Sequence, residues 1–265
     1  MTTKLLFGFH AVGVRVKTAP TSIVEIYVDA NRRDTRMRQF TDKAKSANLK
    51  IIEADSARLL KLAGSNNHQG VVAKVSADVK QESLDELLDR LQTTENQQAP
   101  QGAWATPLFL LLDSVTDPHN LGACLRVADG AGVHAVVAPK DHAVGVNATV
   151  AKVASGAADT IPYFMVTNLS RTIKELQECG VWVIGTSDAA EHSIYEVDLT
   201  GPVALVLGAE GSGMRQLTAK NCDQLVSIPM LGGVESLNVS VASGVCLFEA
   251  VRQRQALAKS TGKIV

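Results

Sequence analysis

The stretch IPMLGGVESLNVSVASGVCLFEAVRQR, residues 228–254, joins an apolar strand to a long amphipathic helix through a loop of small and polar residues. Ser236 and Asn238 stand at the predicted start of that helix, where such side chains satisfy the unpaired N–H groups of the first turn. Taken alone, the pattern fits a structural helix cap as well as a binding loop whose N–H groups face a ligand. Two further segments favour the binding loop.

These two segments are LLDSVTDPHNLGACLRVADGAG, residues 111–132, and VALVLGAEGSGM, residues 203–214. In each, a continuous apolar run predicts a buried strand, and a polar loop containing glycine leads from it toward a helix. The chain therefore places three such loops at the carboxyl ends of strands, which is where open α/β sheets bind their ligands.

From residue 107 onward, short apolar strands alternate with helices. The predicted strands are 108–114, 134–139, 161–166, 181–187, 203–208 and 224–230, and the predicted helices are 124–131, 148–156, 171–180 and the C-terminal one. This alternation predicts an α/β fold with a doubly wound parallel sheet covered on both faces. The glycine-rich loop follows the fifth strand, whereas a dinucleotide fingerprint follows the first, which argues against a nicotinamide or flavin enzyme.

The chain divides into three parts. Residues 1–76 contain predicted strands at 22–30, 49–55 and 70–76 and helices at 35–47 and 56–64, which together form a small α/β domain. Residues 77–106 hold a helix with leucines on one face, followed by a linker rich in Gln and Pro. Residues 107–265 form the larger α/β domain.

Composition indicates an ordinary globular protein, with 46% hydrophobic and 20% charged residues. No apolar run is long enough for a signal peptide or a membrane span, so we expect a cytoplasmic protein without a membrane partner. The cysteines occur singly, at positions 124, 179, 222 and 246, without a histidine cluster. We interpret them as reduced, mostly buried thiols and expect no metal site.

The net charge of −1 conceals an asymmetry, because residues 1–75 carry 13 Lys or Arg against 6 Asp or Glu. The densest basic cluster is Arg32, Arg33, Arg36 and Arg38. Such a segment predicts contacts with nucleic-acid phosphates, although an arginine-rich helix start can also be a solvated face. No aromatic residues interleave with these arginines, which favours recognition of shape or backbone over base stacking.

The three C-terminal motifs, in their order along the chain, resemble the signatures of the SpoU (TrmH) group of SPOUT methyltransferases. The resemblance covers about residues 108–254, and the segments at His10 and His68 are similar to the N-terminal domain of members that act on large-subunit ribosomal RNA. It implies an α/β-knot catalytic domain with a trefoil knot, a small N-terminal RNA substrate-binding domain, S-adenosylmethionine as cofactor, and a homodimer. The implied reaction is methylation of the ribose 2′-hydroxyl of a guanosine in 23S ribosomal RNA. The implied partner is this RNA within an assembly intermediate of the ribosome.

Two alternatives remain open at this point. One is 2′-O-methylation of a tRNA guanosine by the same chemistry. The other is a non-catalytic RNA-binding factor in ribosome assembly that retains the fold. Loss of the motif residues Arg126 or Asn238 would favour the second alternative, and both are present.

The resemblance assigns site residues to the three loops. The catalytic set is Arg126, Asn120, Glu210, Asn238 and Ser236, and the cofactor is expected against backbone groups of Gly208, Ile228 and Leu237. A guanidinium holds its proton too tightly to be an easy base, so we expect Arg126 to stabilise negative charge on the 2′-oxygen. Glu210 is expected to accept hydrogen bonds from backbone or from Arg126, and an Arg126–Asp129 surface pair is the structural alternative. Glycines 208, 211 and 213 are expected to let the cofactor approach the backbone.

Overall fold

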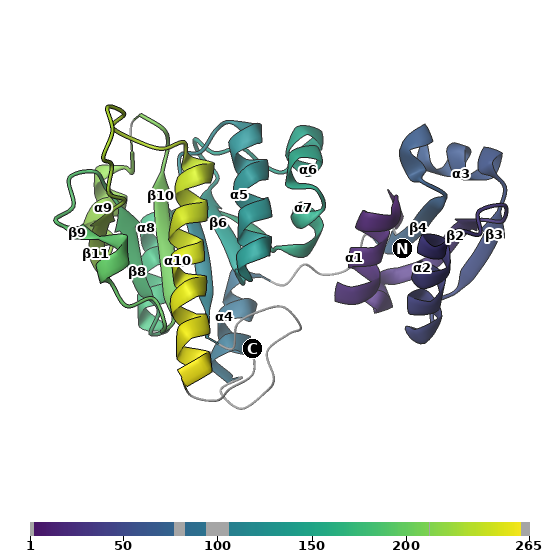
Figure 1. Ribbon diagram of the computed structural model, residues 1–265, viewed down its shortest axis with the longest axis horizontal. Coiled ribbons are helices and arrows are strands. Elements are labelled where there is room, and N and C mark those ends of the chain that lie inside the picture. The colour runs from purple at the N-terminus through teal and green to yellow at the C-terminus, as the bar shows by residue number, and fades with distance from the viewer. Residues whose placement is uncertain (1–2, 77–82, 94–105, 212, 261–265) are drawn as a thin grey trace. The chain divides into compact units, whose positions relative to one another are not determined.

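The computed structural model describes residues 3–76, 83–93, 106–211 and 213–260 (Figure 1). The chain forms two compact units, residues 1–81 and 82–265. Each unit has its own sheet and its own hydrophobic core, so each is described separately.

The N-terminal unit is a four-stranded sheet with helices packed against it. Its elements are β1 (Thr3–Phe7), α1 (Phe9–Thr18), η1 (Pro20–Ser22), β2 (Ile23–Asp29), α2 (Thr35–Ser46), β3 (Ile51–Ala54), α3 (Ser56–Ala63), η2 (Asn66–His68) and β4 (Val71–Ser76). The strand order is β1-β4-β2-β3, with β4 antiparallel to both neighbours and β2 parallel to β3. The three strands and two helices predicted after residue 20 are confirmed.

Local signals explain where the helices of this unit begin and end. Asp34 caps α2 by accepting a hydrogen bond from the Met37 N–H at 2.9 Å, and Asp55 does the same for α3. Helix α3 ends at Gly64, whose φ of +63° suits glycine. Strand β1 and helix α1 were not predicted. Valines at every second position of α1 weaken its helical signal.

The C-terminal unit contains a seven-stranded sheet in which every pairing is parallel. Its strands are β5 (Leu108–Asp113), β6 (Ala135–Pro139), β7 (Tyr163–Val166), β8 (Trp182–Thr186), β9 (His192–Ser193), β10 (Val203–Gly208) and β11 (Gln224–Ser227). Its helices are α4 (Leu84–Thr93), α5 (Pro118–Ala131), α6 (Ala148–Ala154), α7 (Ala157–Thr160), α8 (Leu169–Glu178), α9 (Gln216–Asn221) and α10 (Val239–Ser260), with the short turn η3 (Ile194–Glu196). The parallel-sheet α/β prediction is confirmed, while the knot stays a prediction.

Helices cover both faces of this sheet. Residues 108, 110 and 112 of β5 face a core shared with α5, α6 and α10, whereas residues 109 and 111 face a core shared with α4 and α8. This is why LFLLLD is apolar on both sides up to its last residue. Helix α4 packs its leucines into the second core, so it belongs to the C-terminal unit. Figure 1 shows α5 and α10 side by side in front of the sheet.

The strand order β7-β6-β5-β10-β8-β11-β9 fixes the binding edge. From β5 the chain proceeds through β6 to β7 at one edge, and β10 lies on the opposite side of β5. The reversal of order between β5 and β10 creates a crevice at their carboxyl ends. Asp113 and Gly208 are partners in the register of the two strands, so the loops that follow them begin side by side.

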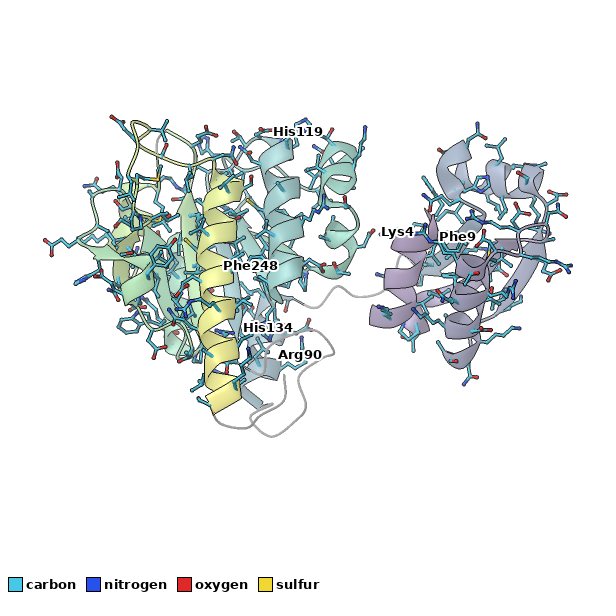
Figure 2. All side chains as sticks on the ribbon, in the orientation of Figure 1. Lys4, Phe9, Arg90, His119, His134 and Phe248 are labelled. Atoms are coloured by element: carbon cyan, nitrogen blue, oxygen red, sulfur yellow. The ribbon has the colours of Figure 1, made fainter. Side chains whose placement is uncertain are left out.

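Two sequence expectations need correction. The glycine-rich loop follows the sixth strand along the chain of this unit, because the two-residue edge strand β9 carries no recognisable strand signal. Helix α10 is less one-sided than expected. It buries a stripe that includes Val239, Cys246 and Ala250, yet Val241 and Phe248 are about half exposed. Figure 2 shows Phe248 on this helix.

Candidate functional site

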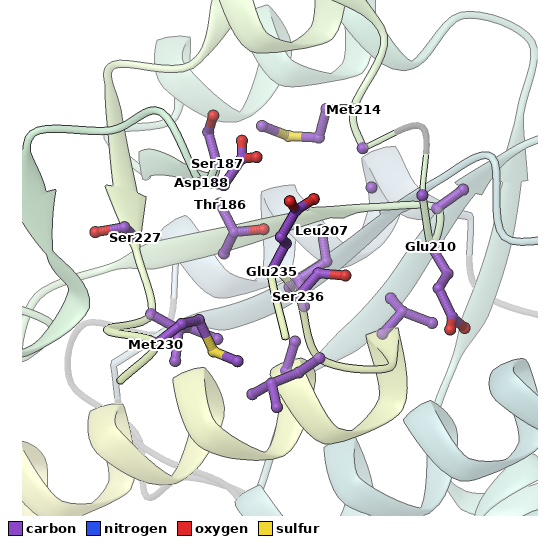
Figure 3. Close-up of a pocket in the computed structure, with 18 of the residues that line it drawn as sticks. Thr186, Ser187, Asp188, Leu207, Glu210, Met214, Ser227, Met230, Glu235 and Ser236 are labelled. Carbon is purple, nitrogen blue, oxygen red and sulfur yellow. The ribbon is translucent and has the colours of Figure 1, made fainter. Parts of the chain in front are cut away.

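A cavity of about 660 Å³ lies at the carboxyl ends of the central strands (Figure 3). Its walls come from the ends of β8, β10 and β11 and from the loops that follow them, with the start of α10 closing one side. All three residues expected to hold the cofactor, Gly208, Ile228 and Leu237, line this cavity, as do Glu210 and Ser236. The structure therefore places five of the eight predicted site residues around one space.

The loop after β10 is a tight reverse turn. Ala209 and Gly213 exchange backbone hydrogen bonds of 3.1 and 2.9 Å, and Gly211 and Gly213 have φ values of +81° and +65°. A Cβ at Gly208 would stand 2.0 Å from the Gly213 carbonyl carbon and 2.1 Å from the Met214 nitrogen. Glycine is thus required at position 208 because a side chain would collide with the backbone of the loop. At positions 211 and 213 glycine is favoured because φ is positive. The loop backbone thus gives these glycines a structural reason beside the expected approach of the cofactor, which stays a prediction.

Asn238 connects the three loops. Its side-chain oxygen accepts hydrogen bonds from the Ser240 N–H (2.9 Å) and hydroxyl (2.6 Å), which caps the start of α10. Its Nδ2 donates to Oδ1 of Asn120 at 2.9 Å and to Oε2 of Glu210 at 3.2 Å. The helix cap considered for this segment is therefore present, and the same side chain also joins it to the two other loops, while the binding role stays a prediction.

A second, smaller hollow of about 260 Å³ adjoins the first. It is lined by the loop after β5, by Asn120 at the start of α5, and by Ala209, Glu210 and Val239. The last three residues also line the larger cavity, so Glu210 stands at the boundary between the two spaces. Such a pair of adjoining spaces can hold two reactants next to each other.

Comparison with known proteins now adds to this geometry. Residues 107–248 match the SpoU rRNA methylase family, and residues 5–79 match the RNA 2′-O ribose methyltransferase substrate-binding family. The chain belongs to the SpoU rRNA methylase family. The resemblance inferred from the three motifs is confirmed.

Curated relatives in this family are similar over nearly their whole length. A 23S rRNA (guanosine-2′-O-)-methyltransferase RlmB from Ralstonia nicotianae is 62% identical over 252 residues, covering 95% of this chain and 96% of the relative. One of the same description from Bordetella pertussis is 55% identical, covering 96% and 98%. Among solved structures, an RNA 2′-O ribose methyltransferase aligns with a TM-score of 0.66 at 25% identity, covering 96% of this chain and 89% of that one. The SpoU methyltransferase AviRb from Streptomyces viridochromogenes, solved with AdoMet, shares the fold with a TM-score of 0.68 at 23% identity, covering 96% and 91%.

Arg126, the first-motif arginine of this SpoU chain, lies apart from the other site residues. It is exposed on α5 and lines neither cavity. Within the described residues it makes no hydrogen bond or ion pair, so the expected contact with Glu210 is not formed in a single chain. Within the described residues the Arg126–Asp129 alternative is also not formed, and Asp129 instead accepts a hydrogen bond from the Thr160 hydroxyl at 2.7 Å.

Sequence reasoning missed the ion pair that anchors the β10 loop. Asp113, the last residue of β5, has no exposed side-chain surface and accepts hydrogen bonds from the backbone N–H (2.9 Å) and Nε (2.7 Å) of Arg215. The loop therefore starts beside Asp113 at Gly208 and returns to it at Arg215. An acidic residue ending an otherwise apolar strand was the available signal, but its partner lies 102 positions away.

The end of β8 was also missed. Thr186, Ser187 and Asp188 line the larger cavity together with Glu235 and Ser236 (Figure 3). The signal existed in the sequence, because small polar residues follow the apolar strand there as they do after β5 and β10. Glu235, which is not part of the motif, lines the same cavity.

The four cysteines are unpaired and have no features of reactive thiols. Burial raises the pKa of Cys124 to about 11 and that of Cys246 to about 12, and burial with Asp223 and Asp113 nearby raises the pKa of Cys222 to about 12. These thiols stay protonated at neutral pH. Within the described ranges, no group of three or more His, Cys, Asp or Glu is arranged to hold a metal ion, and no helix is long and apolar enough to cross a membrane.

Proposed function

We propose that this protein transfers a methyl group from S-adenosylmethionine to the ribose 2′-hydroxyl of a guanosine in 23S ribosomal RNA. The observation that carries the proposal is the pair of adjoining spaces that meet at Glu210, the carboxylate to which Asn238 donates a hydrogen bond. The larger space suits the cofactor and the smaller one suits the target ribose. The relatives that are 62% and 55% identical are described as methyltransferases of this specificity.

The larger cavity suits S-adenosylmethionine in size and in the chemistry of its lining. It has room for a ligand of that size, and Gly208, Ile228 and Leu237 offer backbone groups at strand and loop ends for the adenine and ribose. Apolar side chains such as Leu207 and Met230 provide a surface for the ring system. The cofactor supplies an activated methyl group, and the protein supplies position and electrostatics.

The polar residues of the smaller space orient the RNA. Asn238 holds Asn120 and Glu210 in fixed positions through its Nδ2, so these side chains are preorganised before substrate binds. Ser236 is exposed on the wall of the adjoining larger cavity, from which it is available to contact the substrate. The proton of the 2′-hydroxyl leaves as the oxygen attacks the methyl group, and a nearby guanidinium lowers the cost of the developing negative charge.

We further propose that Arg126 supplies this guanidinium to the site of a second copy in a homodimer. Arg126 is exposed, unpaired within the described residues, and outside both cavities of its own chain. Val241 and Phe248 expose apolar surface on α10, the helix that packs against α5. A dimer through this region buries apolar area and brings Arg126 toward another chain.

The two units have separate proposed roles. Residues 1–76 bind the RNA and residues 107–265 carry the methyltransferase site. Helix α4, which lies in the predicted connecting segment 77–106, packs in the core of the second unit. The match of residues 5–79 to a substrate-binding family supports the first role, and the exposed Arg33, Arg36 and Arg38 provide charge for phosphate contacts. We place the protein in the cytoplasm, acting on a ribosome assembly intermediate.

The test is a comparison of cells with and without the gene. Nucleoside mass spectrometry of purified 23S RNA should lose one 2′-O-methylguanosine, and primer extension should map it to one position. A loss confined to the tRNA fraction would favour the tRNA alternative. An unchanged nucleoside content in both fractions would favour a non-catalytic assembly factor.

A further inference from the structure

The charges around the larger cavity are of one sign. Its lining includes three carboxylates, Asp188, Glu210 and Glu235, and none of the described residues that line it is Lys, Arg or His. The three come from the loops after β8, β10 and β11, so they surround the space from different sides. A cleft lined by charges of one sign concentrates ligands of the opposite sign.

Two of these carboxylates have no partner within the described parts of the chain. Glu210 accepts a hydrogen bond from Asn238, whereas Asp188 and Glu235 make neither a hydrogen bond nor an ion pair there. Figure 3 shows both side chains at the cavity, with Glu235 rising from its loop toward the end of β8. Carboxylates without an internal partner leave their charge to act on whatever occupies the cavity.

The reaction changes the charge of the cofactor. S-adenosylmethionine carries a sulfonium, an ammonium and a carboxylate, so its net charge is about +1 at neutral pH. Methyl transfer breaks the bond between sulfur and the methyl carbon, and the electron pair stays on sulfur. The 2′-oxygen forms the new bond and its proton passes to solvent. The product S-adenosylhomocysteine is therefore neutral overall, and it differs from the cofactor mainly by one methyl group and one charge.

We propose that Asp188 and Glu235 make the cavity prefer the charged cofactor over the neutral product. The inference rests on the proposed function, because it assumes that the larger cavity is the cofactor site. Their charges attract the sulfonium form and lose most of that attraction once the methyl group has left. The pair thereby limits product inhibition and favours exchange of product for fresh cofactor.

The test compares ligands that differ in charge. Titration calorimetry would measure the affinities of three ligands: S-adenosylmethionine, S-adenosylhomocysteine and sinefungin, a stable analogue with an amine in place of the sulfonium. The proteins compared are wild type, Asp188→Asn, Glu235→Gln and the double variant. Each substitution should weaken the two cationic ligands about two- to threefold, the effect of unit charges ~8 Å apart in a solvent-filled site, and the double variant about four- to ninefold. The affinity for S-adenosylhomocysteine should change less than about twofold.

Glu191→Gln is the matched control, since it removes an exposed carboxylate from the same inter-strand segment as Asp188 but outside the cavity lining. It should change none of the three affinities. Raising salt to ~0.5 M should weaken S-adenosylmethionine binding more in wild type than in the double variant.

Two outcomes would overturn the inference: an equal loss of affinity for charged and neutral ligands, and no loss for either. The first would mean that the carboxylates shape the loops or hydrogen-bond a part common to both ligands. A wild-type protein that binds none of the three ligands would instead refute the proposed cofactor site and, with it, the proposed function.

Discussion

Arg215 binds the buried carboxylate of Asp113 through its backbone N–H, its Nε and its Nη2, at 2.9, 2.7 and 2.7 Å. The contact ties the end of the β10 loop to the end of β5, while Gly208 at the start of the loop is the register partner of the same Asp113. Both ends of the loop that bears Glu210 are therefore fixed to one residue. The geometry of the candidate site depends on this anchor.

Replacing Arg215 with Met should loosen the loop and leave Asp113 buried without its cation. Because Arg215 is itself 45% exposed, we expect a loss of about 1–3 kcal/mol in the free energy of unfolding, below the range for a fully buried pair. S-adenosylmethionine binding should weaken as well. Urea denaturation and calorimetry would measure both. Arg171→Met, which breaks the exposed pair with Glu175, should change stability by less than about 1 kcal/mol, and an equally small effect of Arg215→Met would show that the anchor is dispensable.

Gly208→Ala should abolish cofactor binding by displacing the loop. A single methyl group at this position would lie 2.0 Å from backbone, a distance that cannot be relieved by a side-chain rotation. The stability of the domain should fall too, by about 1–3 kcal/mol, which would not happen if Gly208 served only to admit the ligand. The control is Gly201→Ala, where a Cβ meets nothing within 4 Å. A stable Gly208→Ala protein with unchanged cofactor affinity would contradict the geometry of the loop.

Arg126→Ala should lower the rate of methyl transfer without changing the affinity for the cofactor. Since Arg126 is exposed and makes no polar contact within the described chain, the fold and the cofactor affinity should stay close to wild type. Single-turnover methyl transfer should fall by about two to three orders of magnitude, as is usual when one transition-state charge contact is lost. Mixing Arg126→Ala with Asn238→Ala protein should restore some activity if the arginine acts in the neighbouring chain's site. Turnover near wild type in the single variant would make Arg126 an ordinary surface residue.

Much of the C-terminal fold could be predicted because most of its strands are short and apolar and alternate with helices along the chain. β5 is the clearest case, since all six of its residues are buried. The placement of the three motif loops at the carboxyl ends of strands also predicted that they lie close together, and Asn238 contacts both Asn120 and Glu210. In these segments the local sequence pattern and the packing of the folded domain favour the same structure, so the structure could be predicted from the sequence.

Other features depend on contacts between distant residues and left no local pattern. The clash that requires Gly208 comes from backbone five and six positions later, and the Asp113–Arg215 pair spans 102 positions. The two-residue strand β9 exists only because β11 pairs with it. Arg126 matched its motif, yet only the three-dimensional structure shows that it stands outside the cavities of its own chain.

The four arginines of the basic cluster in the N-terminal unit have different environments, although they lie close together in the sequence. The guanidinium groups of Arg32 and Arg36 each lie 4.8 Å from the centre of the Phe9 ring, and Arg32 donates to the Gln69 carbonyl oxygen at 2.7 Å. These two arginines therefore help to hold the α1 start and the loop before β4. Replacing all four arginines would mix a loss of packing with a loss of charge.

Arg33 and Arg38 give the cleaner test of RNA docking, because both are exposed and neither lies over the Phe9 ring. The double change to Ala should lower RNA affinity and flatten its salt dependence, by about 0.9 in the logarithmic slope for each lost contact with a duplex phosphate. Cofactor affinity and stability should not change. Filter binding across a salt series would measure the slope, with Lys174→Ala on α8 of the other unit as control.

Deleting residues 1–76 should reduce the affinity for RNA further, while the remaining unit, with its own core, still folds and binds the cofactor. Equal slopes for wild type, the double variant and the truncated chain would place target recognition wholly in the C-terminal unit.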